Sequence, residues 1–385
     1  MSVPRVALVA GEASGDLLAA HLIEALKKQY PQATFFGIGG PKMEAAGFDA
    51  WWPAEKLAVR GYVEVLRHYR EISGIRRQLL KRLLSERPDI LIGVDAPDFN
   101  LWLEKRIKAV GIPTVHFVGP SVWAWRRGRL KKIGQSVSRI LALFPFEPAL
   151  YTQHGIAVSY VGHPMADMIP WQIDKESVRD RLGVSGRPVF ALLPGSRQSE
   201  LDYMAETFVK TAKLLHQRFP QAVFLVPLVS RETRNQFEEA QWRCDAQELP
   251  IKLMFGHAQD ALAACDAALV ASGTATLEAA LVKRPMVITY RMSPWSWQLT
   301  KLMRYQPWVG LPNILAERFV VPEFLQEQST PENLAQALGN LVGEKALAAA
   351  LEQTFLDIHL NLQQNTALAA AAAITQELGD RFAVA

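Results

Sequence analysis

Residues 266–290, DAALVASGTATLEAALVKRPMVITY, hold the pattern that decides the fold of this chain. Asp266–Ala271 is an apolar run of strand length, and Ser272-Gly273-Thr274 predicts a tight turn. The apolar residues after the turn recur at helical spacing, so the turn opens a helix, and MVITY then returns as a strand. This pattern predicts strands that alternate with helices around a parallel sheet.

The same turn has the chemistry of an anion site. Backbone N–H groups at a helix start point outward, and the helix dipole favours an anion there by roughly 0.3–1 kcal/mol. The hydroxyls of Ser272, Thr274 and Thr276 lie close by, and Glu278 follows about one turn later, where its carboxylate can accept hydrogen bonds from sugar hydroxyls. The stretch from Ser272 through Gly273 to Glu278 therefore predicts a diphosphate site. The alternative is an ordinary helix cap whose side chains face solvent.

Length and composition predict a soluble cytosolic protein with two domains. The 385 residues are too many for one ordinary core and suit two domains of roughly 150–200 residues each. A net charge of +4 is too small for a nucleic-acid groove, and Cys244 and Cys265 stand apart from any His-Cys cluster. The uncharged stretch 109–125 is interrupted by glycines and prolines, so we expect no membrane-spanning helix, and the N-terminus predicts no export signal.

Two series of strand-length apolar runs, each alternating with helical patterns, predict an α/β protein. A polar connection at 164–188, rich in Pro and Gly, separates the two series. We expect two Rossmann-like doubly wound domains facing a cleft, with residues 1–170 for the acceptor and membrane and residues 171–345 for the UDP-sugar. Residues 346–385 are expected to form C-terminal helices, one of them long, over about 347–381. The pattern leaves open whether they cross back to the first domain or exchange with a partner chain.

Polar motifs follow four of the predicted strands. They are GEASGD (11–16), GVDAPDFN (93–100), PGSRQSE (194–200) and SGTATLE (272–278). Ligands of open parallel sheets bind outside the carboxyl ends of the strands, so these motifs mark the two walls of the expected cleft. The second domain has the stronger phosphate signal and is expected to hold the nucleotide, which leaves the first domain for the acceptor.

These motifs, read with PSVWAWR and LPN, resemble in order and spacing the lipid-A-disaccharide synthases of Gram-negative bacteria. The resemblance covers almost the whole chain. It implies an inverting glycosyltransferase of the GT-B type, with UDP-2,3-diacylglucosamine as donor and 2,3-diacylglucosamine 1-phosphate as acceptor. The implied products are the β-1,6-linked disaccharide 1-phosphate and UDP. The resemblance also suggests a homodimer with exchanged C-terminal segments.

Direct displacement with inversion requires a general base beside the acceptor hydroxyl. We expect Asp95 to be this base, because it ends the predicted strand DILIGVD and matches the position of the family's proposed base. Asp98 is the alternative base, or else it caps a helix that starts near Asn100. Glu12 matches a family position implicated in activity and is expected to orient acceptor hydroxyls or to tune Asp95. Otherwise Glu12 and Asp16 flank a helix start.

The departing UDP must be neutralised by the protein itself, because the sequence shows no metal-binding spacing and predicts no cofactor. Arg197 is the expected agent, because a guanidinium binds phosphate oxygens bidentately and this residue matches one that the family needs. Gly195 and Ser196, just before it, are expected to let the backbone approach the diphosphate.

Two further motifs are expected to contact the substrate. Asn313, in LPN, matches a family residue required for activity, and its amide can donate to and accept from a sugar or phosphate; otherwise it caps a loop. Gly256 and His257, in FGH, end a predicted strand beside the expected uracil pocket, where backbone groups read the base edge.

An amphipathic basic segment, residues 57–84, is expected to lie on the cytoplasmic face of the inner membrane. Val63, Val65 and Leu66 fall within four positions, more than one core-facing stripe can bury. The alternative for the C-terminal half is an ordinary Rossmann helix.

Other functions stay open at this point. A MurG-like transferase or a sugar 2-epimerase shares the phosphate cradle but lacks GEASGD together with DAPDFN. A non-catalytic carrier of UDP-sugar or lipid would not need Asp95. An NAD-dependent oxidoreductase is disfavoured, because GEASGD lacks the G-x-G-x-x-G spacing.

Overall fold

The structure, a computed structural model, describes residues 3–57, 62–124, 127–303 and 305–379. Two compact units share the chain. Unit 1 comprises Met1–Asp167 and Leu362–Ala385, and unit 2 comprises Met168–Asn361. The sequence analysis treated residues 346–385 as one separate segment, whereas the structure divides that segment between the two units.

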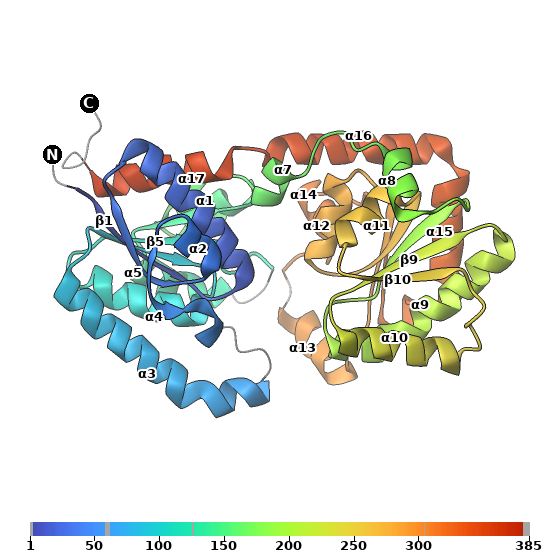
Figure 1. Ribbon diagram of the computed structural model, residues 1–385, viewed down its shortest axis with the longest axis horizontal. Helices are drawn as coiled ribbons and strands as arrows, with labels where there is room; N and C mark the ends of the chain where they lie inside the picture. The colour runs from blue at the N-terminus through green and yellow to red at the C-terminus, as the bar shows by residue number, and fades with distance from the viewer. Residues whose placement is uncertain (1–2, 58–61, 125–126, 304, 380–385) are drawn as a thin grey trace. The chain divides into compact units, whose positions relative to one another are not determined.

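Unit 1 is built on a seven-stranded parallel sheet in the order β3-β2-β1-β4-β5-β6-β7 (Figure 1). The strands are β1 (Arg5–Ala10), β2 (Thr34–Gly39), β3 (Asp49–Pro53), β4 (Ile90–Val94), β5 (Thr114–Phe117), β6 (Arg139–Ala142) and β7 (Ala157–Tyr160). The helices are α1 (Ala13–Gln29), α2 (Pro41–Ala45), α3 (Tyr62–Glu86), α4 (Pro97–Lys108), α5 (Leu130–Ser136), α6 (Glu147–Thr152), α7 (Pro164–Met168) and α17 (Thr366–Leu378). One core cluster joins the sheet to α1 and α17, and another joins it to α3 and α4. The central strands are therefore buried on both faces, as their continuous apolar sequences predicted.

The C-terminal helix α17 is part of the core of unit 1, where it packs against α1. The single long helix expected over about 347–381 is wrong, because α16 (Lys345–Leu362) ends and α17 begins after a break. Asn365 adopts a left-handed backbone with φ 53° at this break. The carboxylate of Asp167 accepts hydrogen bonds from the N–H groups of Asn365 (3.0 Å) and Thr366 (2.7 Å), so a distant side chain caps the new helix.

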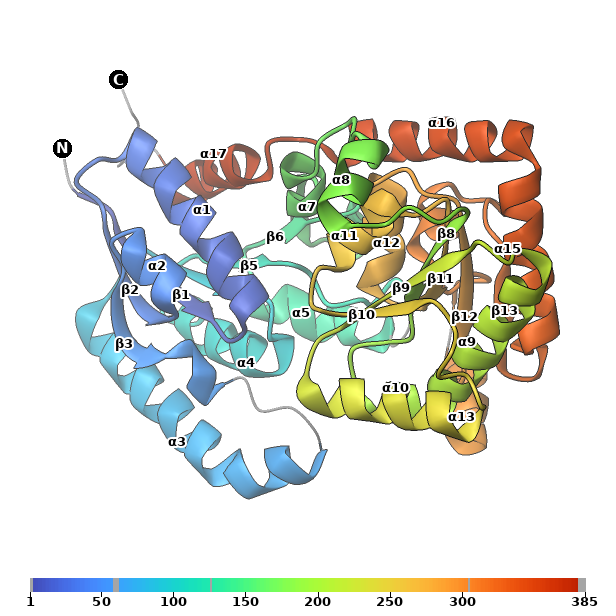
Figure 2. The ribbon, with the colours of Figure 1, turned by 45° about the vertical axis from the view of Figure 1, so that its right-hand side comes forward.

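Unit 2 is built on a six-stranded parallel sheet in the order β10-β9-β8-β11-β12-β13 (Figure 2). The strands are β8 (Val189–Leu193), β9 (Val223–Leu228), β10 (Ile251–Phe255), β11 (Ala267–Ala271), β12 (Met286–Tyr290) and β13 (Glu323–Leu325). The remaining helices are α8 (Lys175–Leu182), α9 (Gln198–Arg218), α10 (Arg231–Arg243), α11 (Ala258–Ala264), α12 (Thr274–Leu281), α13 (Pro294–Met303), α14 (Leu311–Leu315) and α15 (Pro331–Gly343). Helix α9 packs beside α10 and α15, whereas α11 and α12 contact the strands directly.

Each sheet has one switch point, where the strand order reverses. In unit 1 it lies between β1 and β4, and in unit 2 it lies between β8 and β11. The four polar motifs of the sequence follow these four strands and no others. Because ligands of doubly wound sheets bind at such points, the topology places all four motifs where binding chemistry is expected.

Candidate functional site

Asp95 lies at the switch point of unit 1, in a turn of two left-handed residues. Its φ is 52° and that of Ala96 is 43°, although neither residue is glycine. Such a conformation costs on the order of 1–3 kcal/mol per residue and persists only where the surroundings fix it. The Asp95 N–H donates to the carbonyl of Phe117 at 2.8 Å, and the buried Asn100 amide donates to the Asp95 carbonyl at 2.8 Å. Asn100 therefore holds the turn that presents Asp95.

Asn100 also ties the turn to the neighbouring strand, because its amide lies 3.3 Å from the Val9 carbonyl. A methyl group on Gly11 would approach Ala96 Cβ at 3.4 Å. The exits of β1 and β4 are thus in contact, and the structure brings the motif of Glu12 beside that of Asp95. Glu12 itself is exposed and precedes α1 without a side-chain capping bond.

Two other carboxylates near the switch point have structural partners. Asp98 is mostly exposed and pairs with Arg129 at 2.5 Å. It lies inside α4, which begins at Pro97, so its expected role as the cap of a later helix is wrong. Asp16 is buried and accepts bonds from the N–H groups of Gly40 and Met43, so it holds the start of α2.

The phosphate cradle expected in unit 2 lies at the start of α12, at the switch point of that unit. Gly273 has a φ of 141°, which residues with a side chain rarely adopt, and it lies exposed at the helix start with Thr274. The Ser272 hydroxyl donates to the Val309 carbonyl at 3.3 Å. The buried Thr276 hydroxyl donates to the Gly273 carbonyl at 2.8 Å and accepts from the Leu311 N–H. The sequence predicted that the Thr276 hydroxyl faces a phosphate. In the structure this hydroxyl is bonded within the protein, so it shapes the cradle from the inside.

Glu278 is half-buried on the first turns of α12. Burial raises the pKa of its carboxyl group above the ordinary value. Its carboxyl group forms no hydrogen bond or ion pair with the described residues. A half-buried carboxylate with open acceptor positions fits a pair of sugar hydroxyls.

Arg197 precedes α9 at the other side of the same switch point. Its guanidinium is 77% exposed, at 3.7 Å from the Glu200 carboxylate. Glu200 Oε2 accepts bonds from the N–H groups of Ser196 (2.8 Å) and Arg197 (3.2 Å), so these two donors already have a partner. Gly195, with φ 123°, leaves room for Glu200, because a Cβ there would lie 2.6 Å from its carboxylate. Glu200, which sequence reasoning missed, fixes this loop.

The ends of three strands converge near Arg197. Tyr290 closes β12, and the pKa of its phenol is raised by burial and by the charge of Glu200, while Arg197 acts to lower it. Strands β8, β11 and β12 are neighbours in the sheet, so their carboxyl ends lie side by side. Tyr290 is a second residue that the sequence analysis did not single out.

Asn313 is fully buried, and its whole amide is engaged. Nδ2 donates to the Val321 carbonyl and to Glu323 Oε1, each at 2.9 Å, and Oδ1 accepts from the N–H groups of Val320 and Val321. The direct contact with a sugar or phosphate that the sequence suggested is therefore not available to this amide. Asn313 instead holds Glu323.

Glu323 connects Asn313 to the cradle. Its carboxylate accepts bonds from the N–H groups of Val309 (3.0 Å) and Gly310 (2.9 Å). The same stretch of chain contacts the hydroxyls of Ser272 and Thr276. Glu323 lies at the start of a three-residue strand, so no sequence pattern marked it.

Gly256 and His257 lie at the end of β10, two strands away from the switch point of unit 2. His257 is exposed, has a left-handed backbone with φ 58°, and contacts Asp260 at 3.0 Å. Their position is compatible with one wall of a nucleotide site, although the structure gives them no contact with Arg197 or Gly273.

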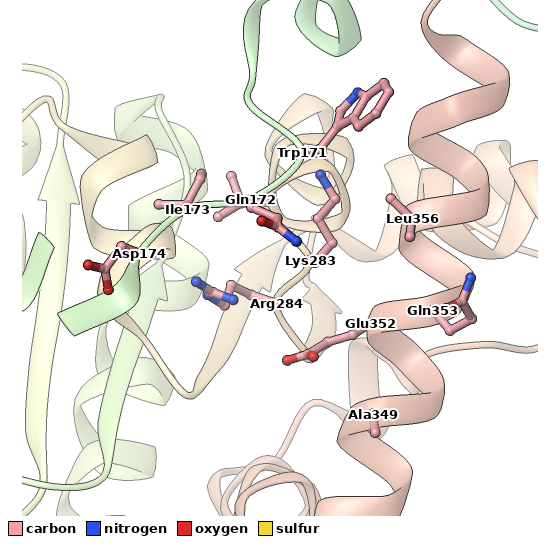
Figure 3. Close-up of a pocket in the computed structure, with 11 residues that line it drawn as sticks. Trp171, Gln172, Ile173, Asp174, Lys283, Arg284, Ala349, Glu352, Gln353 and Leu356 are labelled. Carbon is pink, nitrogen blue, oxygen red and sulfur yellow. The ribbon is translucent and has the colours of Figure 1, made fainter. Parts of the chain in front are cut away.

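A pocket of about 1180 Å³ lies within unit 2 between α16 and the loop that precedes α8 (Figure 3). Lys283 and Arg284 line it, at the amino end of β12. The Lys283 side chain points toward Trp171, and burial together with Arg284 lowers the pKa of its ammonium group to about 8. The cradle lies at the carboxyl ends of the strands, so this pocket is separate from the candidate site.

Two properties of the described residues bear on metal and membrane chemistry. Among them, no group of three or more His, Cys, Asp or Glu residues is placed to hold a metal ion. No helix within the same residues is both long and apolar enough to cross a bilayer. Val63, Val65 and Leu66 lie in α3, but their side chains fall outside what the structure describes.

Two doubly wound units with ligand-type loops at both switch points define the GT-B type of fold. A UDP-N-acetylglucosamine 2-epimerase of Neisseria meningitidis, solved with UDP-GlcNAc, matches with a TM-score of 0.62 and 13% identity over 97% of this chain and 99% of its own. A putative UDP-N-acetylglucosamine 2-epimerase of Listeria monocytogenes matches with a TM-score of 0.69 and 12% identity over 99% and 98% of the two chains. Identity this low shows the fold alone.

Sequence comparison is more specific. A family described as lipid-A-disaccharide synthetase matches residues 6–376. The lipid-A-disaccharide synthase of Dechloromonas aromatica is 62% identical over 97% of this chain and 99% of its own length, and that of Neisseria meningitidis serogroup B is 51% identical over 98% of both. The chain belongs to the lipid-A-disaccharide synthase family and is a glycosyltransferase.

Proposed function

We propose that this chain transfers 2,3-diacylglucosamine from UDP-2,3-diacylglucosamine to 2,3-diacylglucosamine 1-phosphate with inversion, giving the β-1,6-linked disaccharide 1-phosphate and UDP. The observation that carries the proposal is the 62% identity to a lipid-A-disaccharide synthase over nearly the full length of both chains. A 2-epimerase activity has only the shared fold in its favour, at 12–13% identity.

In this proposal Asp95 is the general base. It takes the proton of the acceptor hydroxyl as the hydroxyl oxygen forms a bond to the anomeric carbon of the donor. The strained turn supports this role, because the backbone is held in a costly conformation just after the carboxyl end of β4, at the switch point where ligands of such sheets bind. Asp98 is a weaker candidate, because Arg129 already pairs with it. Glu12, on the adjoining loop, orients the acceptor.

Unit 2 holds UDP in the same proposal. The helix start at Gly273 and Thr274 offers backbone N–H groups to the diphosphate, and Glu278 accepts hydrogen bonds from hydroxyl groups of the ligand. Arg197 neutralises the charge that develops on the departing UDP, so no metal ion is required. Its high exposure leaves the guanidinium available for a ligand.

Asn313 has a positioning role in this scheme. Its amide fixes Glu323, and Glu323 fixes the chain that contacts Ser272 and Thr276. Loss of Asn313 would thus loosen the cradle without removing any group that touches the substrate.

The lipid substrates place the enzyme at a bilayer. We propose peripheral association with the cytoplasmic face of the inner membrane, through the amphipathic part of α3 that contains Val63, Val65 and Leu66. A homodimer formed by exchange of C-terminal helices stays a prediction. It would place the partner's copy of α17 against α1, and the molecular mass in solution would test it.

The experiment is an assay of the purified chain with UDP-2,3-diacylglucosamine and 2,3-diacylglucosamine 1-phosphate, with and without a metal chelator. The proposal expects equal rates in both and a β-linked product. Formation of a 2-epimer without disaccharide would contradict the proposed transfer. A rate abolished by the chelator and restored by a divalent cation would contradict the metal-free role of Arg197.

A further inference from the structure

The chain between β12 and β13 carries a stretch with unusual composition. Residues 291–308, here called the α13 segment, contain no aspartate or glutamate but include three cations, Arg291, Lys301 and Arg304. The segment also holds three of the ten tryptophans of the chain. Its aromatic residues are Trp295, Trp297, Tyr305 and Trp308. Tryptophan and tyrosine with cations and without acids is the composition of a surface at a membrane–water interface.

The structure exposes part of this aromatic set instead of burying it. Trp295, on the first turn of α13, is 88% exposed, and Tyr305 is 53% exposed. Lys301 lies with its ammonium group 5.2 Å from the Trp297 ring centre, so cation and aromatic ring occupy the same side of the helix. A tryptophan this exposed gains little from the core of unit 2, so its ring is available to a ligand or partner.

Three hydroxyl groups at and near the start of α13 have hydrogen-bond partners in the same segment. The Ser293 hydroxyl accepts from the Ser296 N–H and contacts the Ser296 hydroxyl at 2.8 Å, and the Thr300 hydroxyl donates to the Ser296 carbonyl at 2.8 Å. Hydroxyl groups that are already bonded cost less to remove from water than open ones. These hydroxyl groups therefore add little to the cost of moving the start of α13 into a less polar environment.

The α13 segment begins and ends beside the phosphate cradle. It leaves from β12, whose Thr289 pairs with Ala271 just before the cradle. It returns at Val309, whose carbonyl accepts the Ser272 hydroxyl. A donor whose diphosphate lies on the start of α12 would hold its acyl chains close to this aromatic surface.

We propose that the α13 segment is a second membrane contact, by which unit 2 rests on a bilayer of anionic phospholipid. Trp295 enters the headgroup boundary, while Lys301 meets lipid phosphates. The contact keeps the nucleotide-binding unit at the surface where acylated donors reside. The purpose of this contact rests on the proposed reaction. The contact itself does not, because lipid binding can be measured without turnover.

The test measures sedimentation of the full chain with vesicles of phosphatidylethanolamine and phosphatidylglycerol. Trp295→Ala and Lys301→Glu are each expected to weaken binding roughly tenfold, and vesicles of phosphatidylcholine alone should bind the native chain more weakly. Trp242→Ala is the matched control. Trp242 is 71% exposed in the same unit, but on α10, whose sequence includes Glu238 and Glu239. That variant should bind as the native chain does.

A second readout places Trp295 in the lipid. Phospholipids brominated on their acyl chains should quench part of the tryptophan emission, and Trp295→Phe should lose that part while Trp242→Phe keeps it. Asp95→Asn should bind vesicles normally, which separates failure of this inference from failure of the proposed reaction. Unchanged vesicle binding in both Trp295→Ala and Lys301→Glu overturns the inference. So does a change confined to self-association in sedimentation velocity, which would make the surface a contact between copies of the chain.

Discussion

The turn that carries Asp95 and the turn that carries Gly273 both follow a buried parallel strand at a switch point. They differ in which residue types adopt the unusual backbone conformations. At the switch point of unit 1 the left-handed positions are Asp95 and Ala96, and a buried amide, Asn100, holds them. At the switch point of unit 2 the unusual positions are glycines 195 and 273, and carboxylates hold the neighbouring loops. The proposed roles account for this difference, because a base must be a side chain, whereas a phosphate is bound by backbone N–H groups that a side chain would crowd.

The largest expected effect comes from removing the side chain that the strained turn presents. Asp95→Asn keeps the shape and the backbone but cannot accept a proton, so kcat should fall by about 10²–10⁴. The affinity for UDP should stay unchanged, because the cradle is in unit 2. Steady-state assays and calorimetric titration with UDP measure both quantities.

Asp98→Asn is the matched control for this variant. It removes a carboxylate three residues away that pairs with Arg129. A kcat that falls more in Asp98→Asn than in Asp95→Asn would exchange the roles of the two residues.

The next effect concerns the exposed cation of unit 2. Arg197→Gln should lower kcat by roughly 10²–10³, because charge on the departing UDP loses its partner in the transition state. Arg243→Gln is a suitable control, since Arg243 is also exposed on unit 2 and pairs with Glu206. Equal rates for the Arg197 variant and the native chain would remove Arg197 from the reaction.

Two residues that act through others should separate kcat from KM. Asn100→Leu leaves the Asp95 carbonyl without its buried donor, which should cost about 1–3 kcal/mol in unfolding free energy and lower kcat roughly tenfold. Glu323→Gln weakens the support of the Val309–Gly310 backbone, because an amide accepts hydrogen bonds less strongly than a carboxylate, and should raise KM for the donor several-fold. If both variants changed only KM, the two turns would not differ as described.

The last prediction concerns the pH dependence of the free energy of unfolding, which Lys283 should influence from a position away from both turns. The pKa of Lys283 is about 8 in the fold and about 10.5 in the unfolded chain, so the unfolded state binds more protons between these values. The native chain should therefore gain stability as pH rises from 8 toward 10. Lys283→Met should lack this gain. Chemical denaturation at pH 7.5 and 9.5 compares the two slopes, and parallel slopes would show that Lys283 titrates normally.

The sequence could predict the two turns because their signals are local. A strand-length apolar run followed by Ser-Gly-Thr, or by Asp-Ala-Pro, identifies a strand exit without any knowledge of distant residues. Gly273 and Asp95 could be chosen by residue type alone, since a glycine adopts backbone angles that other residues avoid and a carboxylate can accept a proton.

The supports of these turns could not be predicted, because the sequence does not show which polar groups meet in the folded chain, whether they are near or far apart along it. The Thr276 hydroxyl meets Leu311, 35 positions away, and the Asn313 amide is consumed by Val320, Val321 and Glu323. The break before α17 likewise depends on Asp167, 199 positions from Thr366. In each case the residue type suggested that the side chain forms hydrogen bonds. Whether it is left to bind a ligand or instead stabilises a loop depends on its partners in the fold.

Hydrogen–deuterium exchange with and without UDP tests most directly whether UDP binds at the turn of unit 2 and not at the turn that carries Asp95. UDP is expected to slow exchange at the start of α12, around Gly273 and Thr274, and in the loop that carries Arg197. No change is expected in the turn that contains Asp95. Protection by UDP of the Asp95 turn, with none at Gly273, would contradict this expectation.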